Sequence, residues 1–66
     1  MSEDKLLHLS YAMAASLLQT AVDTGEVEKM CEAENYSQDI TQALKHSVGE
    51  HIKYLSALSN HYARFK

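Results

Sequence analysis

Apolar residues recur at helical spacing over residues 3–23. At 100° per residue these side chains cover about half of the helix circumference, with a narrow polar strip opposite. The arc consists of Leu6, Leu7, Tyr11, Met13, Ala14, Leu17, Leu18, Ala21 and Val22, and Leu9 and Ala15 widen it. The expected solvent strip consists of Lys5, His8, Ala12, Ser16, Gln19 and Asp23. Ser2 is suited to be the N-cap and Gly25 to end the helix.

A second amphipathic pattern covers residues 36–64. Its apolar residues follow one another by three or four positions without a gap, as one face of a helix requires. This expected core stripe is Tyr36, Ile40, Leu44, Val48, Ile52, Leu55, Leu58, Tyr62 and Phe65. Asn35 and Gln38 have the spacing of a capping box, which predicts a helix start near residue 36. Gly49 is expected opposite the stripe.

The segment between the two patterns predicts a short connecting helix. If the first helix continued past Gly25, its apolar face would receive Glu28, Lys29 and Glu32, so the phase breaks near Thr24. Residues 26–33 place their apolar side chains on one side, and Asp23 with Glu26 has capping-box spacing. The sequence therefore predicts one all-α domain over residues 1–66, an antiparallel hairpin of two helices (3–23 and 36–64) with a helical connector (26–33).

The apolar surface exceeds what such a hairpin can hide, because two packed helices cover only one stripe of each. On the first helix, the Leu7–Tyr11–Leu18 row and the row containing Leu6 and Leu17 cannot both face the second helix. The second helix is also longer, about 45 Å against about 30 Å, which predicts an aromatic overhang at its C-terminal end. The expected partner-binding residues are Leu6, Met13, Leu17, Tyr54, Leu58, His61, Tyr62 and Phe65.

Length and charge point toward association with another protein. A chain of 66 residues is marginally stable alone, and its single cysteine, Cys31, allows no internal disulfide and favours a cytoplasmic setting. The net charge of −3 argues against nucleic-acid binding. Polar residues interrupt 6–22, so neither a membrane span nor a signal peptide is expected there.

We find no motif for catalysis or for cofactor binding. The four histidines, His8, His46, His51 and His61, include no pair spaced three or four apart on one helix, and glutamates flank Cys31 instead of the cations that activate a thiol. We therefore expect no enzyme activity, metal, cofactor or small-molecule substrate. A histidine at an interface, such as His51, would make association sensitive to pH.

The expected function is a protein–protein interaction module, a bacterial or phage regulator, adaptor or inhibitor. The expected binding partner is a second copy of the chain, which would complete a four-helix bundle, and/or a larger protein. Tyr36, Gln38, Glu50 and Ile52 in the second half give the chain a similarity to the small E-component chaperones of type III secretion needles, which implies a co-chaperone. The length and layout also resemble the RNA-binding Rop dimers, although the exposed strip is poor in positive charge for that role.

Overall fold

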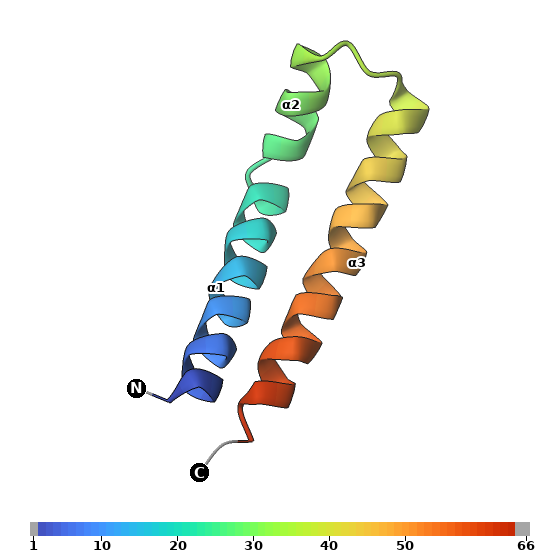
Figure 1. The fold of residues 1–66 in the computed structure, drawn as a ribbon. Helices are drawn as coiled ribbons and strands as arrows, with labels where there is room; N and C mark the ends of the chain where they lie inside the picture. The colour runs from blue at the N-terminus through green and yellow to red at the C-terminus, as the bar shows by residue number, and fades with distance from the viewer. Residues whose placement is uncertain (1, 65–66) are drawn as a thin grey trace.

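The computed structural model describes residues 2–64, and all regular secondary structure in that range is helical. The helices are α1 (Glu3–Asp23), α2 (Glu26–Ala33) and α3 (Gln38–Tyr62). Figure 1 shows α1 and α2 following one another along one leg of a hairpin, with α3 returning antiparallel beside them. The hairpin is 47 Å long and 16 Å across. The prediction of an all-helical protein is confirmed.

The first leg bends at Gly25 because this residue adopts a left-handed backbone with φ of +77°. At the start of α1, the Ser2 hydroxyl accepts a hydrogen bond from the Lys5 backbone N–H at 3.2 Å, as expected of an N-cap. The predicted capping box between Asp23 and Glu26 is wrong. Gly25 is the N-cap of α2 without a side-chain hydrogen bond, and Asp23 accepts from the Gln19 amide at 3.0 Å.

The start of α3 differs from the prediction, because Asn35 ends α2 instead of capping α3. Asn35 has φ of +58°, and the Tyr36 N–H donates to the Cys31 carbonyl at 3.0 Å, a bond typical of a Schellman C-cap. The N-cap of α3 is Ser37, whose hydroxyl accepts from the Ile40 N–H at 3.3 Å. The helix therefore runs over 38–62 rather than 36–64.

The predicted aromatic overhang is wrong, because α2 extends the first leg. The two turns of α2 add about 12 Å to α1, so the leg reaches the length of α3 (Figure 1). The N-terminal half of α1 packs on the C-terminal end of α3: His8 contacts Ser59, and the rings of Tyr11 and Tyr62 stack with centroids 5.8 Å apart.

Small residues make the contact between the two legs. The buried side chains are Ala15, Cys31, Thr41 and Ser59. Two members of the predicted solvent strip, His8 and Ala12, are instead half-buried. The His8 Nδ1–H donates to the Ser59 carbonyl at 2.9 Å, and the Ser59 hydroxyl donates back to the His8 carbonyl at 3.0 Å. Small side chains and this polar pair let the helices approach closely.

Candidate functional site

The predicted core stripe of α3 lies at the edge of its contact with α1, and this prediction is wrong for its first three members. Tyr36, Ile40 and Leu44 are exposed by 47%, 48% and 38%. The line of α3 that faces the first leg passes instead through Thr41 and Ser59, which are both buried. The Thr41 hydroxyl is satisfied by donating to the Ser37 carbonyl at 2.9 Å. The larger apolar side chains of α3 therefore lie beside the contact.

The first leg likewise keeps large apolar side chains outside the contact. Leu6, Met13 and Leu17 of α1 are exposed by 56%, 66% and 66%, and Met30 of α2 by 68%. The neighbouring row of α1 is half-buried; it contains Leu7, Tyr11, Ala14 and Leu18. Of the two rows that compete for the contact in the sequence pattern, the row with Leu7, Tyr11 and Leu18 packs on α3.

The exposed side chains of Leu17 on α1 and of Leu44 and Ile40 on α3 lie on the same side of the hairpin. Viewed along the chain direction of α1, a rotation about the helix axis from buried Ala15 passes half-buried Leu18 and reaches exposed Leu17. Viewed along the chain direction of α3, a rotation in the same direction from Thr41 passes Leu44 and reaches Ile40. Because the two helices are antiparallel, equal senses lead to the same side of the plane through their axes.

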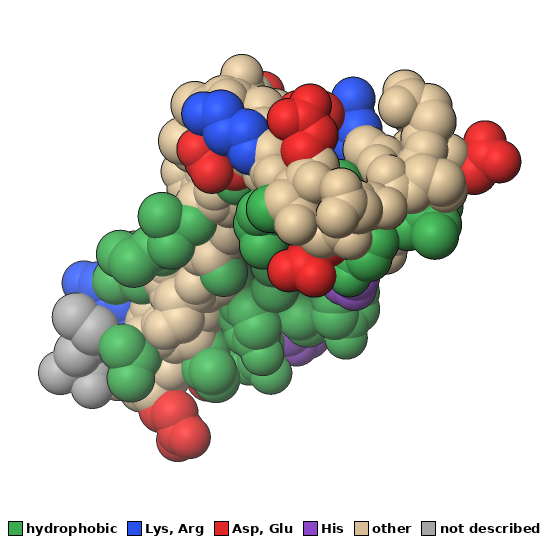
Figure 2. All heavy atoms as spheres, turned by 90° about the horizontal axis from the view of Figure 1, so that it is seen from above, with side chains coloured by type: hydrophobic (Ala, Val, Ile, Leu, Met, Phe, Trp, Pro, Cys, Tyr) green, Lys and Arg blue, Asp and Glu red, His purple; other side chains and the backbone are tan. Residues whose placement is uncertain are grey.

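Figure 2 looks at the hairpin from its closed end and shows many hydrophobic side chains along the lower side, whereas most of the visible basic side chains and several acids lie along the upper side. Nine large apolar side chains of the described residues are exposed, and we call seven of them the apolar face; Leu9 and Tyr36 are exposed but are not included. The apolar face consists of Leu6, Met13, Leu17, Met30, Ile40, Leu44 and Tyr54. No side chain among these seven carries a charge, so the hairpin as a whole is amphipathic.

A groove of about 510 Å³ lies near the closed end of the hairpin, between α2 and α3. Its lining is mainly apolar, and Cys31 is buried within it. The residues around it are Val27, Met30, Cys31, Glu34, Tyr36, Leu44 and Val48. Two of them, Met30 and Leu44, belong to the apolar face, so the groove is a depression in that face.

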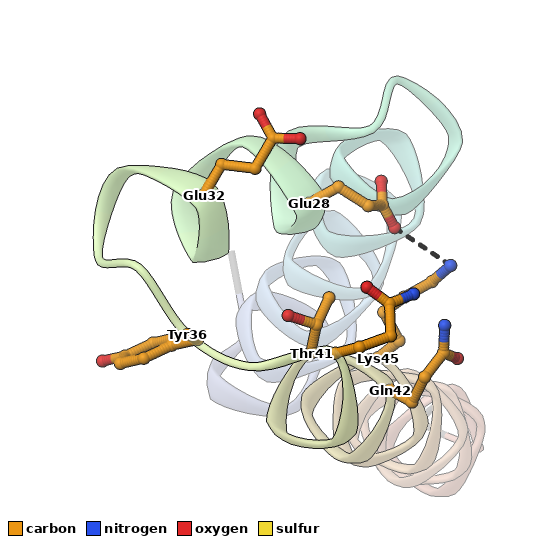
Figure 3. Close-up of a pocket in the computed structure, with 7 residues that line it drawn as sticks. Glu28, Glu32, Tyr36, Thr41, Gln42 and Lys45 are labelled. Atoms are coloured by element: carbon orange, nitrogen blue, oxygen red, sulfur yellow. Dashed lines mark ion pairs between the residues drawn. The ribbon is translucent and has the colours of Figure 1, made fainter.

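A second hollow, of about 310 Å³, is polar and is lined by Glu28, Glu32, Tyr36, Gln38, Thr41, Gln42 and Lys45. Figure 3 shows Glu28 reaching from α2 toward Lys45 of α3, with Tyr36 pointing away from this pair. The carboxylate and the ammonium are 3.1 Å apart. The hydrogen bond from Lys45, together with its positive charge, lowers the pKa of Glu28. This ion pair joins the closed end of the hairpin on its polar side.

The predicted partner-binding residues divide into three groups. Leu6, Met13, Leu17 and Tyr54 lie on the apolar face, and His61 is also exposed. Leu58 and Tyr62 are half-buried, and the Tyr62 ring, stacked nearly parallel on Tyr11, helps to hold the hairpin together. Phe65 lies outside the described residues.

Sequence reasoning did not assign the closed-end part of the apolar face to partner binding. Ile40 and Leu44 were placed in the hairpin core, and Met30 was assigned only to one side of the connector. The sequence does contain a signal for these residues. Two packed helices hide only one stripe of each helix, and α3 carries more large apolar residues than one stripe contains, so some of them must remain exposed.

Residues 2–64 contain no group of three or more His, Cys, Asp or Glu side chains placed to hold a metal ion. No helix in this described part of the chain has the length and apolar character needed to cross a membrane.

No protein-family model, curated protein or solved structure matches the chain.

Proposed function

We propose that this protein is a protein–protein interaction module that binds another chain through its apolar face. The observation that carries the proposal is the exposure of seven large apolar side chains, each between 38% and 68%, of which Leu17, Ile40 and Leu44 lie on one side of the hairpin. Contiguous apolar patches of this kind on soluble proteins mark interaction sites.

The hairpin also lacks an apolar core of its own. The only buried apolar residues in the described chain are Ala15 and Cys31, and no described side chain is fully buried. Burial of large aliphatic and aromatic side chains supplies most of the stability of a small domain. A second layer on the apolar face would provide that burial.

The occupant that best fits this face is a second copy, completing a four-helix bundle. A rectangle of 47 by 16 Å covers about 750 Å², so two facing copies would bury about 1,500 Å², within the usual range of about 1,200–2,000 Å² for stable interfaces. None of the seven side chains that define the apolar face is charged, and Glu34 is the one acidic residue that lines the groove within it. A larger protein on the same face is the alternative occupant.

The proposed role is that of a cytoplasmic regulator, adaptor or inhibitor, which acts by occupying a surface of its target. A co-chaperone would use the same face with a larger partner. RNA binding in the manner of Rop is disfavoured, because three of the four lysines in the described chain are paired with acids: Lys29 with Glu26 at 3.6 Å, Lys45 with Glu28 and Lys53 with Glu50.

Matched aspartate substitutions on the two sides of α1 test the proposal. Met13→Asp places a charge on the apolar face, whereas Ser16→Asp places the same charge on an exposed position outside it. Light scattering after size exclusion should show an assembled wild type, an assembled Ser16→Asp variant and a dissociated Met13→Asp variant. Equal masses for the two variants, or a helical wild-type monomer at high concentration that binds no protein, would contradict the proposal.

A further inference from the structure

We propose that His51 is a pH switch for self-association: it lies within the contact between two copies, and its protonation separates them. This inference rests on the proposed function, because it requires a second copy on the side of the hairpin that carries Leu44 and Ile40. It follows from three observations: the direction in which His51 points, the uncharged residues around it, and its position at the middle of the hairpin.

His51 interrupts an apolar row of α3. Leu44 lies seven residues before it and Leu58 seven residues after it, and residues seven apart lie on nearly the same helix face. His51 lies about 80° around the helix axis from Thr41, which is buried. In the same direction, Leu44 lies at about 60° and Ile40 at about 100°. His51 is exposed in the single hairpin, so it points out of the side that a second copy would cover.

No charged residue of α3 shares this side with His51. Its neighbours one turn away on the helix are Ser47, Val48, Tyr54 and Leu55. The phenol of Tyr54 is the one titratable group among them, and phenols are neutral at acidic and neutral pH. Glu50 lies about 180° around the axis from the buried line of α3, where it pairs with Lys53 at 3.4 Å. The nearest charges of α3 therefore lie away from His51.

The part of α1 level with His51 is also uncharged. His8 contacts Ser59, and the residue numbers in this and the other contacts between the legs add to between 67 and 73. Residues 16–22 of α1 therefore lie level with His51, and none of their side chains titrates. Asp23 comes next, but it lies about 80° from the buried line of α1 in the opposite direction, on the polar side.

The acids of the closed end are paired or distant. Glu26 and Glu28 are each paired with a lysine, and Glu32 lines the polar hollow. Glu34 lines the groove on the apolar side. At 1.5 Å per residue, Glu34 is roughly 20 Å along the hairpin from the level of His51, more than two screening lengths at physiological salt. No acid of the described chain is therefore placed to stabilise a charged imidazole at position 51.

A second copy would leave these surroundings uncharged in either orientation. α3 spans residues 38–62, so its midpoint is residue 50, next to His51. When two hairpins cover each other over their full length, the middle of one lies over the middle of the other, whether the closed ends lie together or at opposite ends. The facing residues are then residues 16–22 or His51 of the second copy, and neither supplies an acid.

Burial of His51 in this contact favours the neutral imidazole, because removing a charge from water without a counter-charge is unfavourable. An imidazole in water titrates near pH 6.5, so a dimer that holds both imidazoles neutral has a Kd that rises about 100-fold between about pH 7.5 and about pH 5.5. Acidification also reduces the net charge of −3, which by itself would favour association. The direction of the change in Kd therefore identifies the switch.

Sedimentation equilibrium at these two pH values, with helix content followed by circular dichroism, tests the switch with two matched variants. His51→Gln keeps a neutral polar side chain at position 51 and should lose most of the change in Kd. His46→Gln removes a histidine that is exposed on α3, about 140° from the buried line in the opposite direction, and it should retain the pH dependence of the wild type.

A wild-type dimer whose Kd is unchanged or lower at the acidic pH, or a His51→Gln variant with the wild-type pH dependence, would overturn the inference and leave the proposed function standing. A wild type that is monomeric at both pH values would overturn both the inference and the choice of a second copy as partner. Where His51→Gln does not dimerise, dilution calorimetry of the wild type near pH 6, in two buffers of different ionisation enthalpy, should show about 1.5 protons taken up per dimer that dissociates. Dissociation without proton uptake would overturn the switch.

Discussion

Replacing Leu17 with alanine should weaken dimerisation strongly while leaving the single hairpin almost unchanged. Leu17 retains 66% of its exposure in the hairpin, so about two thirds of its burial remains available to a partner. Leu17→Ala removes three carbon atoms, worth about 2.4 kcal/mol when fully buried at about 0.8 kcal/mol per carbon. The loss is therefore about 1.6 kcal/mol per copy and about 3.2 kcal/mol per symmetric dimer.

At about 1.4 kcal/mol per factor of ten, this loss raises the dimer Kd by about 200-fold. Sedimentation equilibrium over a series of loading concentrations measures the change directly. Ser16→Ala is the matched control, because Ser16 is exposed beside Leu17 in sequence but lies off the apolar face; its Kd should remain within about twofold of the wild type. A Leu17→Ala variant with an unchanged Kd would refute the reasoning that Leu17 is buried by a second copy.

Three further predictions concern the hairpin itself. Ser59→Ala removes a buried hydroxyl that donates to the His8 carbonyl and should lower the free energy of unfolding by about 1–3 kcal/mol in urea melts; no loss would mean that the pair is dispensable. Gly49→Ala should raise the stability by about 1 kcal/mol, because a Cβ at this helical position meets no atom within 4 Å; a lower thermal midpoint would contradict this. The lowered pKa of Glu28, caused by its hydrogen bond and proximity to Lys45, means that its stabilising contribution is present above the ordinary value of 4.5 and is lost as the pH falls through the lowered pKa. Glu28→Gln should therefore flatten the loss of stability in that acidic range, and acid titrations that coincide with the wild type would exclude the ion pair as its source.

Helix identity could be read from the sequence because local signals specify it. Periodic apolar residues, the Ser2 cap and the break at Gly25 depend only on neighbouring positions, and they gave the ends of α1 and α2. The start of α3 was missed because Asn35 suits two roles. It can cap a helix start or adopt the left-handed conformation that ends one, and the hydrogen bond from Tyr36 to Cys31 selects the second role.

Which residues of each helix lie in the contact between the two legs could not be predicted in the same way. A helical wheel ranks positions by hydrophobicity, so it assigned Ile40 and Leu44 to the core and His8 to solvent. The hairpin instead packs through small side chains and the pair of His8 with Ser59. Close approach of the helix backbones and matched polar partners depend on residues about 50 positions apart, which periodicity does not reveal.

The most direct test of the account is the thermal midpoint of the wild-type chain as a function of its concentration, followed by circular dichroism together with mass. If the apolar face is completed by a second copy, unfolding is coupled to dissociation, and the midpoint rises with concentration while the mass approaches twice 7.4 kDa. A midpoint that is independent of concentration, with a helical species of 7.4 kDa throughout, would contradict the claim that the hairpin requires a second copy.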